Sequence, residues 1–261
     1  MKTKMNFTKK DFIVTLTCIV FLLANIAAIG TSGRRRAKEA VCLSNLHQWG
    51  NIFKAFINDN DGYLMHGWYE GPSHSWYNAL RPYYSDNKEL LLCPQAAKPL
   101  ADYGADPSGG IFNTWDGGTH DGQQYYGSYG ICSCILDAPF LSTDHWRRAD
   151  VAGTDNIPLL LDAQYFTSFP WWSNEPPEYE GARWRSGATG GGMGIFCIPR
   201  HYGASNGLFL DFSARKIGLK ELWLLKWCRG YDVSRASENE PDWENTGTGW
   251  MLPLKDYNYT P

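Results

Sequence analysis

The sequence predicts an α+β protein in which one long N-terminal helix precedes a β-rich domain. Three observations support this fold class. Residues 12–29 of the 261-residue chain form an apolar stretch without charge. Apolar residues then recur mostly three or four positions apart as far as residue 57, which is the periodicity of a helix packed on one face. The middle of the chain is rich in aromatic residues and is interrupted by Gly and Pro, which favours short strands and long loops.

The apolar stretch predicts a membrane-spanning helix over residues 7–33, although its uncharged part is near the lower limit of about 20 residues. Basic residues flank both sides equally, so they do not orient the helix. They are Lys2, Lys4, Lys9 and Lys10 on one side, and Arg34, Arg35, Arg36 and Lys38 on the other. A cleaved secretory signal is the alternative, because small residues occur near Ala28. Both interpretations export the rest of the chain.

After an interruption at residues 31–33, helical periodicity predicts a second helical segment over residues 34–58. The apolar positions are Ala37, Val41, Leu43, Leu46, Trp49, Phe53, Phe56 and Ile57. We expect the helix to end before Gly62, because Gly tolerates the left-handed conformation at a helix C-terminus. We therefore interpret the acidic residues 59 and 61 as a solvated cap at the end of the helix. A calcium loop is the alternative, but the required Glu is missing and Glu70 is only nearby.

Beyond the helix, the sequence predicts a β-rich region over residues 63–218 and a helix and tail over residues 219–261. Residues 208–210 read as a buried strand, 211–215 as a turn and 216–219 as the return strand. Phe212 follows Asp211 where a Gly would allow a two-residue turn. Because positive φ is unfavourable for Phe212, we expect a longer connection.

The cysteines leave several arrangements open. Cys18 lies in the apolar stretch, and the exported part contains Cys42, Cys93, Cys132, Cys134, Cys197 and Cys228. Six cysteines in an oxidising compartment allow fifteen disulfide pairings. Zinc binding through Cys132 and Cys134 is an alternative, although zinc motifs usually have two to four residues between the cysteines. We predict no metal and no cofactor.

Three groups of residues carry a resemblance to a known family. The first is Asn6-Phe7-Thr8-Lys9-Lys10-Asp11. The second is the helix sequence from Cys42 through Asn45 to Gly50, followed by the Asp-Asn-Asp-Gly-Tyr-Leu exit within Asn58 to Leu64. The third is the segment from Arg200 through His201 to Asp211. Shorter matches are Leu92-Cys93-Pro94, Gly127-Ser128-Tyr129-Gly130 and Leu161-Asp162-Ala163.

Together these residues resemble the type IV pilin-like proteins of type II secretion systems (pseudopilins), in particular the planctomycete-type branch with a C-terminal H-x9-DG element. In that family a basic leader ends in Gly, and Phe-Thr and a helical Glu follow. Here Asn6 stands in place of the Gly, Asp11 in place of the Glu and Phe212 in place of the final Gly. The family signature residues are Cys42, Asn45, His201 and Asp211.

The resemblance implies a pilin-like fold, with the helix packed on an antiparallel sheet, and a non-catalytic structural subunit of a pseudopilus or pilus-like filament. Residues 1–6 would be a leader removed by prepilin peptidase, and Phe7 would then be N-methylated. Asp11 would pair with a neighbouring subunit during assembly. Partners would be further copies and other pseudopilins, through the N-terminal helix. The protein would cross the inner membrane once, with residues 34–261 periplasmic or extracellular.

The resemblance also weakly favours a disulfide between Cys42 and Cys93, since both lie in matching motifs. His201 and Asp211 are more simply explained by hydrogen bonds to nearby backbone groups than by metal binding or acid–base catalysis.

The second class of function is a carbohydrate-binding or carbohydrate-active exported protein. Trp171, Trp172 and Trp184 could stack on sugars, although most aromatic residues fill cores. Residues 117–122 are the nearest approach to a catalytic loop, and a turn explains them equally well. The formal net charge of −3 provides no basic field, so we expect no nucleic-acid partner.

Overall fold

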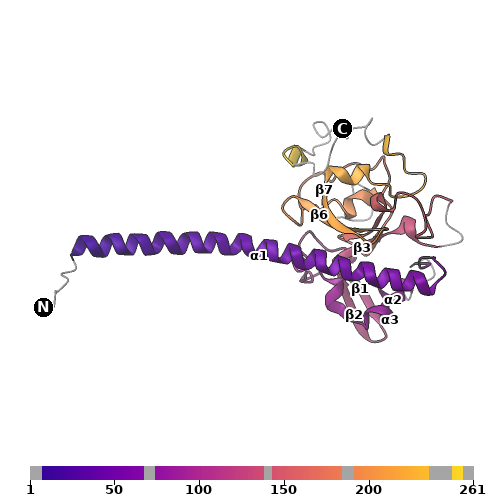
Figure 1. The fold of residues 1–261 in the computed structure, drawn as a ribbon, viewed down its shortest axis with the longest axis horizontal. Helices are drawn as coiled ribbons and strands as arrows, with labels where there is room; N and C mark the ends of the chain where they lie inside the picture. The colour runs from indigo at the N-terminus through magenta and orange to yellow at the C-terminus, as the bar shows by residue number, and fades with distance from the viewer. Residues whose placement is uncertain (1–7, 68–73, 138–142, 184–190, 235–248, 255–261) are drawn as a thin grey trace. The chain divides into compact units, whose positions relative to one another are not determined.

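The computed structural model describes residues 8–67, 74–137, 143–183, 191–234 and 249–254, without the side chains of residues 23–29 and 31. The chain divides into two compact units, Met1–Lys38 and Glu39–Pro261. The α+β class is confirmed, with antiparallel and mixed sheets beside several helices (Figure 1).

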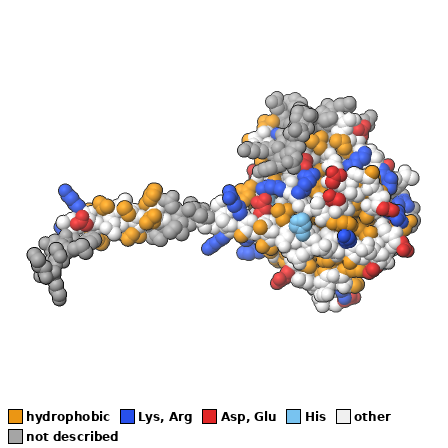
Figure 2. Space-filling model, in the orientation of Figure 1, with side chains coloured by type: hydrophobic (Ala, Val, Ile, Leu, Met, Phe, Trp, Pro, Cys, Tyr) orange, Lys and Arg blue, Asp and Glu red, His pale blue; other side chains and the backbone are white. Residues whose placement is uncertain are grey.

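The described part of the first unit belongs to helix α1, Lys9–Asp59, which continues into the second unit. The predicted interruption at residues 31–33 is wrong, because α1 runs through it. Helix propensity is a weak prior, and a single Gly costs only about 1 kcal/mol in a helix. Figure 2 shows hydrophobic side chains along the first unit. Within the described residues, no helix combines the length and apolar character required to cross a membrane.

In the second unit, one face of α1 is buried at three- and four-residue intervals, through Cys42, Leu46, Trp49, Phe53 and Ile57. Val41, predicted to be buried, is 49% exposed, because the buried stripe passes through its neighbour Cys42 instead. The helix ends as predicted: Gly62 has φ +86°, and its N–H donates to the Ile57 carbonyl at 2.9 Å.

The acidic cap has protein partners. Asp59 accepts a hydrogen bond from the Tyr83 hydroxyl at 3.1 Å, and Arg148 donates to the Asp61 carbonyl at 3.0 Å. Neither carboxylate belongs to a group of metal-binding geometry among the described residues. These contacts favour the cap over the calcium loop.

The strands start later than predicted. Residues 74–114 contain the short helices α2 (Trp76–Ala79) and α3 (Arg81–Tyr84) and the 3-10 helix η3 (Lys88–Leu91), whereas the first strand begins at Trp115. The prediction of a β-rich region from residue 63 is therefore wrong over its first fifty or so residues. Frequent Gly and Pro identify breaks in the chain but not whether strands or short helices lie between them.

In the part of the chain that the structure describes, seven strands form two sheets. β1 (Trp115–His120) and β2 (Gln123–Gly127) form an antiparallel hairpin. The second sheet has the order β5-β3-β4-β6-β7, in which only the β3–β5 pair is parallel. Its strands are β3 (Tyr129–Cys132), β4 (Pro158–Asp162), β5 (Thr167–Ser168), β6 (Ala204–Phe209) and β7 (Ala214–Gly218).

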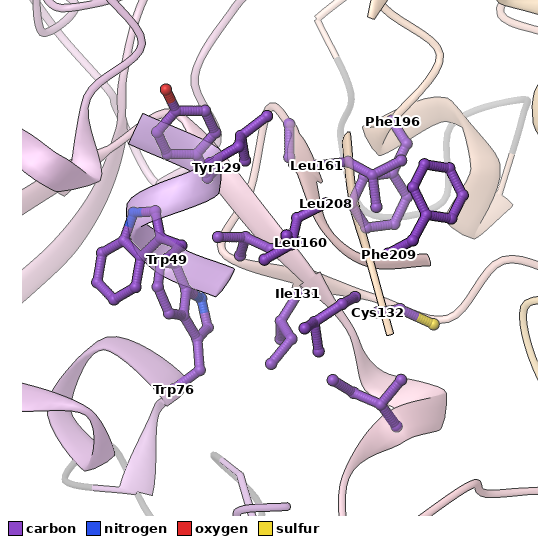
Figure 3. Packing of buried hydrophobic residues seen from close by; sticks show 14 of the residues in the cluster. Trp49, Trp76, Tyr129, Ile131, Cys132, Leu160, Leu161, Phe196, Leu208 and Phe209 are labelled. Atoms are coloured by element: carbon purple, nitrogen blue, oxygen red, sulfur yellow. The ribbon is translucent and has the colours of Figure 1, made fainter. Parts of the chain in front are cut away.

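The core of the second unit lies where α1 and α2 meet the five-stranded sheet. Figure 3 shows Trp49 and Trp76 beside one another near Leu160 and Ile131. The two indole rings pack edge to face with centroids 5.1 Å apart. Gly50 fits against β6 and the turn after it, because a Cβ there would lie 3.2 Å from Leu208.

The β6–β7 connection comprises residues 210–213, longer than two residues as predicted. Phe212 nevertheless adopts φ +66°, so the expectation that it would avoid positive φ is wrong. Asp211 accepts hydrogen bonds from the Ser213 N–H at 2.9 Å and hydroxyl at 2.7 Å, which fixes the turn. The predicted helix after residue 219 is the 3-10 helix η7, Lys220–Leu224. Further 3-10 turns are η4 (Ser133–Ile135), η5 (Thr154–Asn156), η6 (Gly191–Ile195) and η8 (Gly249–Met251).

Candidate functional site

Four side chains that are distant in sequence meet in the interior of the second unit: Cys42 in α1, Cys93 just after η3, Asp162 at the end of β4 and His201 just before β6. Their sulfur, oxygen and nitrogen atoms all lie within 4.8 Å of one another, and all four residues are buried. We call these four residues the buried polar cluster.

Asp162 is the centre of the cluster. Its Oδ1 lies 2.8 Å from Nη1 of Arg200, and its Oδ2 lies 3.1 Å from Nε2 of His201. The backbone N–H of Asn206 also donates to Oδ2 at 2.9 Å. Burial alone would raise the pKa of Asp162, but the His201 and Arg200 charges and these hydrogen bonds outweigh it and lower the pKa. The carboxylate is therefore ionised although its side chain has no exposed surface.

Arg200 provides the opposite charge and binds the surrounding backbone. Its guanidinium donates to the carbonyls of Ile111 at 2.6 Å, Ser128 at 2.6 Å and Ala163 at 3.2 Å. These acceptors lie in a loop, at the start of β3 and just beyond β4. A buried guanidinium needs such partners, because an unpaired charge in the interior is costly. Arg200 thus joins three segments around Asp162.

His201 lies between Asp162 and Cys93, with Nε2 3.3 Å from the Cys93 sulfur and Nδ1 3.3 Å from the Gln95 amide nitrogen. Burial lowers the pKa of His201, but the charge and hydrogen bond of Asp162 outweigh burial and raise the pKa to about 9. Contrary to our sequence interpretation, the imidazole bonds other side chains and not nearby backbone groups.

The pKa values of the two thiols, Cys42 and Cys93, are shifted in opposite directions. For Cys93, burial opposes ionisation, yet hydrogen bonds with Cys42 and His201 and the charge of Arg200 lower its pKa to about 6. For Cys42, burial, the hydrogen bond with Cys93 and the charge of Asp162 raise the pKa well above its usual value. Tyr129 donates its hydroxyl to the Cys42 sulfur at 3.4 Å. A thiolate at Cys93 therefore faces an imidazolium at His201.

This arrangement allows two kinds of chemistry. The cluster can bind a metal ion, or Cys42 and Cys93 can be oxidised to a disulfide. A nucleophilic role toward an external substrate does not fit, because both thiols are fully buried. The predicted Cys42–Cys93 bridge stays a prediction: the structure brings the two side chains together and holds them as free thiols.

The other predicted site residues lie elsewhere. Asn6 and Phe7 lie outside the described residues. Asp11 caps the start of α1: its carboxylate accepts hydrogen bonds from the Thr8 N–H at 2.9 Å and hydroxyl at 2.7 Å. Asn45 donates to the Leu92 carbonyl at 3.1 Å and so ties α1 to the segment that carries Cys93. The Asp211 carboxylate accepts its hydrogen bonds from Ser213 within the β6–β7 turn.

Asp162 and Arg200 were not predicted as members of the site. The sequence does mark both positions, because Asp162 belongs to one of the short matching motifs and Arg200 directly precedes His201. Neither residue has a local pattern that would reveal an ion pair between positions 38 residues apart.

A second group of thiols brings Cys134 beside Cys132 and Cys228, and burial with these neighbours raises the pKa of Cys134. The Cys132 thiol donates to the Trp227 carbonyl at 3.6 Å. In the described part of the chain, the buried polar cluster is the one set of three or more ligand residues with donor atoms close enough to share a metal ion. The alternative of zinc at Cys132 and Cys134 thus gains no support.

The tryptophans considered for sugar stacking and the loop considered for catalysis have structural contacts where the structure describes them. Trp171 and Trp172 are half-buried and pack against the core, and Trp171 stacks on Phe169 with ring centroids 5.9 Å apart. Trp184 lies outside the described residues. Asp121 and Gly122, with φ of +52° and +75°, form the two-residue turn between β1 and β2.

Comparison with family models, with curated proteins and with solved structures finds no match for this chain.

Proposed function

We propose that this chain is a structural, non-catalytic subunit of a type II secretion pseudopilus or a related pilus-like filament. The start of α1 would lie in the inner membrane, and the second unit would be periplasmic or extracellular. The observation that carries the proposal is the exposed apolar surface at the start of α1. Large apolar side chains between positions 12 and 22 are 47% to 68% exposed: Phe12, Ile13, Val14, Leu16, Ile19, Val20, Phe21 and Leu22.

Consecutive apolar residues such as those at positions 12–14 and 19–22 lie on all sides of a helix and not on one stripe. A helix that is apolar all round requires lipid or other helices around it. Lys and Arg side chains border this stretch on both sides (Figure 2). Outside lipid, partner helices would have to bury this surface, which is the physical basis of a filament core.

The buried polar cluster supports the family resemblance in a second way. Cys42, Cys93, Asp162 and His201 each belong to a different matching motif, and the fold brings them into one place. Chance matches scattered over the sequence would have no reason to converge. This convergence supports a fold shared with the family, whereas the role in secretion depends on the N-terminal helix.

Mass spectrometry of the protein purified from its native membrane tests the processing step. We expect a mature chain that begins at Phe7 with a methylated amino group. An intact Met1 would remove the pseudopilin interpretation and leave a plain membrane anchor. A start at Thr31 would instead identify a cleaved secretory signal.

Crosslinking of subunits tests assembly, and the native Cys18 provides the probe because it is exposed whereas the other six cysteines are buried. A bis-maleimide reagent applied to membranes should join neighbouring chains through Cys18. Asp11→Ala should lower the crosslinking yield severalfold, because the carboxylate would pair with the amino terminus of the next subunit. A Cys18→Ser variant gives the background.

The cap described above requires a matched control, since Asp11→Ala also removes the hydrogen bonds with Thr8. Thr8→Ala removes the hydrogen bonds of the Thr8 hydroxyl but keeps the carboxylate and its bond from the residue 8 N–H, so it should retain crosslinking, and Asp11→Glu should restore it. Equal losses in Asp11→Ala and Thr8→Ala would show that Asp11 only caps the helix. Full crosslinking and normal secretion in Asp11→Ala would refute its role in assembly.

A further inference from the structure

We propose that Cys42, Cys93, Asp162 and His201 bind one zinc ion that holds the second unit together. The inference is independent of the proposed role in secretion, because it depends only on the interior of the second unit. It differs from the metal-free site that the sequence predicts.

The four donor atoms lie close enough together to surround one zinc ion, since all of them are within 4.8 Å of one another. Zinc bonds of about 2.3 Å to sulfur and 2.0–2.2 Å to nitrogen and oxygen place neighbouring ligand atoms about 3.4–3.8 Å apart. In the structure, the Cys93 sulfur lies 3.3 Å from Nε2 of His201, and that nitrogen lies 3.1 Å from Oδ2 of Asp162. The Cys42 sulfur lies 3.9 Å from the same oxygen. These three distances are within a few tenths of an ångström of the tetrahedral values.

The charges of the cluster also fit a divalent cation. Two thiolates and one carboxylate carry three negative charges, and a zinc ion together with the Arg200 guanidinium carries three positive charges. The occupied site would therefore be neutral, as a buried site requires.

Three of the four ligands have a further partner that holds them in place. Tyr129 donates to the Cys42 sulfur, Arg200 binds Oδ1 of Asp162 and leaves Oδ2 toward the cluster, and Gln95 lies beside Nδ1 of His201. Such outer contacts are typical of protein zinc sites, where they fix the orientation of the ligands.

The position of the site indicates a structural ion. The ligands come from α1, the segment after η3, the end of β4 and the segment before β6, so one ion would crosslink four parts of the chain. All four side chains are buried, which leaves no open position for a substrate. A disulfide between Cys42 and Cys93 is the competing state. It needs a disulfide oxidant that accepts two electrons, and it uses only two of the four side chains.

The full chain, purified in detergent without chelators, tests the proposal. Zinc is measured by mass spectrometry of the elements, and thiols by alkylation of the denatured, unreduced protein. We expect about one zinc per chain, with Cys42 and Cys93 both alkylated once zinc is removed. A mapped Cys42–Cys93 disulfide without zinc would overturn the proposal, and so would reduced thiols that take up no zinc when it is added.

Variants locate the ion. Cys93→Ser and His201→Gln should abolish stoichiometric zinc, whereas Cys197→Ser, a buried cysteine outside the cluster, should keep it. Because the cluster variants could fail to fold, cobalt(II) in the unmodified chain gives a second measurement. An intense tetrahedral visible spectrum with a thiolate charge-transfer band is expected. A weak octahedral spectrum would refute the site. Cys18 crosslinking is measured separately, so failure of one proposal leaves the other standing.

Discussion

Arg200 offers the sharpest test of the buried polar cluster, because it is fully buried and is not one of the four proposed ligands. Arg200→Met keeps most of the side-chain volume and removes the charge. Asp162 then loses its closest cation, and the carbonyls of Ile111 and Ser128 lose the guanidinium as a donor, although the Ser128 carbonyl keeps the Ala163 N–H. Breaking a buried ion pair in this way typically costs about 3–5 kcal/mol.

The matched control is Arg148→Met. Arg148 pairs with Asp150 at 2.7 Å, close to the 2.8 Å between Arg200 and Asp162, but the Asp150 side chain is 63% exposed. An exposed pair contributes about 0–1 kcal/mol. The two variants make the same chemical change at an ion pair, and they differ in burial. A difference of at least 2 kcal/mol between them is therefore expected.

Urea unfolding of the full chain in detergent, followed by tryptophan fluorescence, measures both variants. If Arg200→Met does not fold, Arg200→Lys keeps the charge but loses the planar fork, and it should lose about 1–3 kcal/mol. A loss below about 1 kcal/mol for Arg200→Met, equal to that of Arg148→Met, would refute the view that the cluster stabilises the fold.

Two further substitutions, one of them with a control, test the packing with the same assay. Gly130→Ala should lower the free energy of unfolding by more than about 2 kcal/mol, because a Cβ there would collide with the Tyr165 carbonyl. The control Gly110→Ala should lower it by less than about 1 kcal/mol, because the nearest neighbour of its Cβ is the end of the Asn113 side chain at 3.4 Å. Equal losses would contradict the close approach at Gly130. Trp49→Phe should cost about 1–3 kcal/mol, because the indole N–H donates at 2.7 Å to a carbonyl of η3 that would be left without this donor. An unchanged unfolding midpoint would argue against that hydrogen bond.

The sequence predicts the second half of α1 well, because a one-sided apolar stripe is a local signal. It also predicts the β6–β7 hairpin approximately, since residues 208–210 and 216–219 overlap these two strands, but not the other strands. The described residues before β1 and between β5 and β6 show no clear sequence period, so their conformation depends on contacts with distant parts of the chain. Phe212 shows the limit of local rules. Its positive φ is unfavourable alone, yet the β6–β7 register and the packing of Phe212 beside Gly50 select it.

The site is predicted only in part for the same reason. Cys42, Cys93 and His201 stand out through their motifs, but the partner that unites them, Asp162, is 120 residues from Cys42. Sequence spacing contains no information on such a distance. The chemistry of the cluster, including the thiolate at Cys93, follows from charges that meet only in the folded state.

The hydrogen bonds of the tryptophans give a structural reason for the high aromatic content of the chain. With strands of two to six residues, the sheets leave many backbone carbonyls without ladder partners. Within the described residues, seven tryptophans donate their indole N–H to a backbone carbonyl: Trp49, Trp76, Trp115, Trp146, Trp223, Trp227 and Trp250. Each fills interior space with its ring and satisfies one carbonyl with its nitrogen, as Arg200 does with its guanidinium. A domain with little regular structure needs such side chains, and this need gives these tryptophans a structural role.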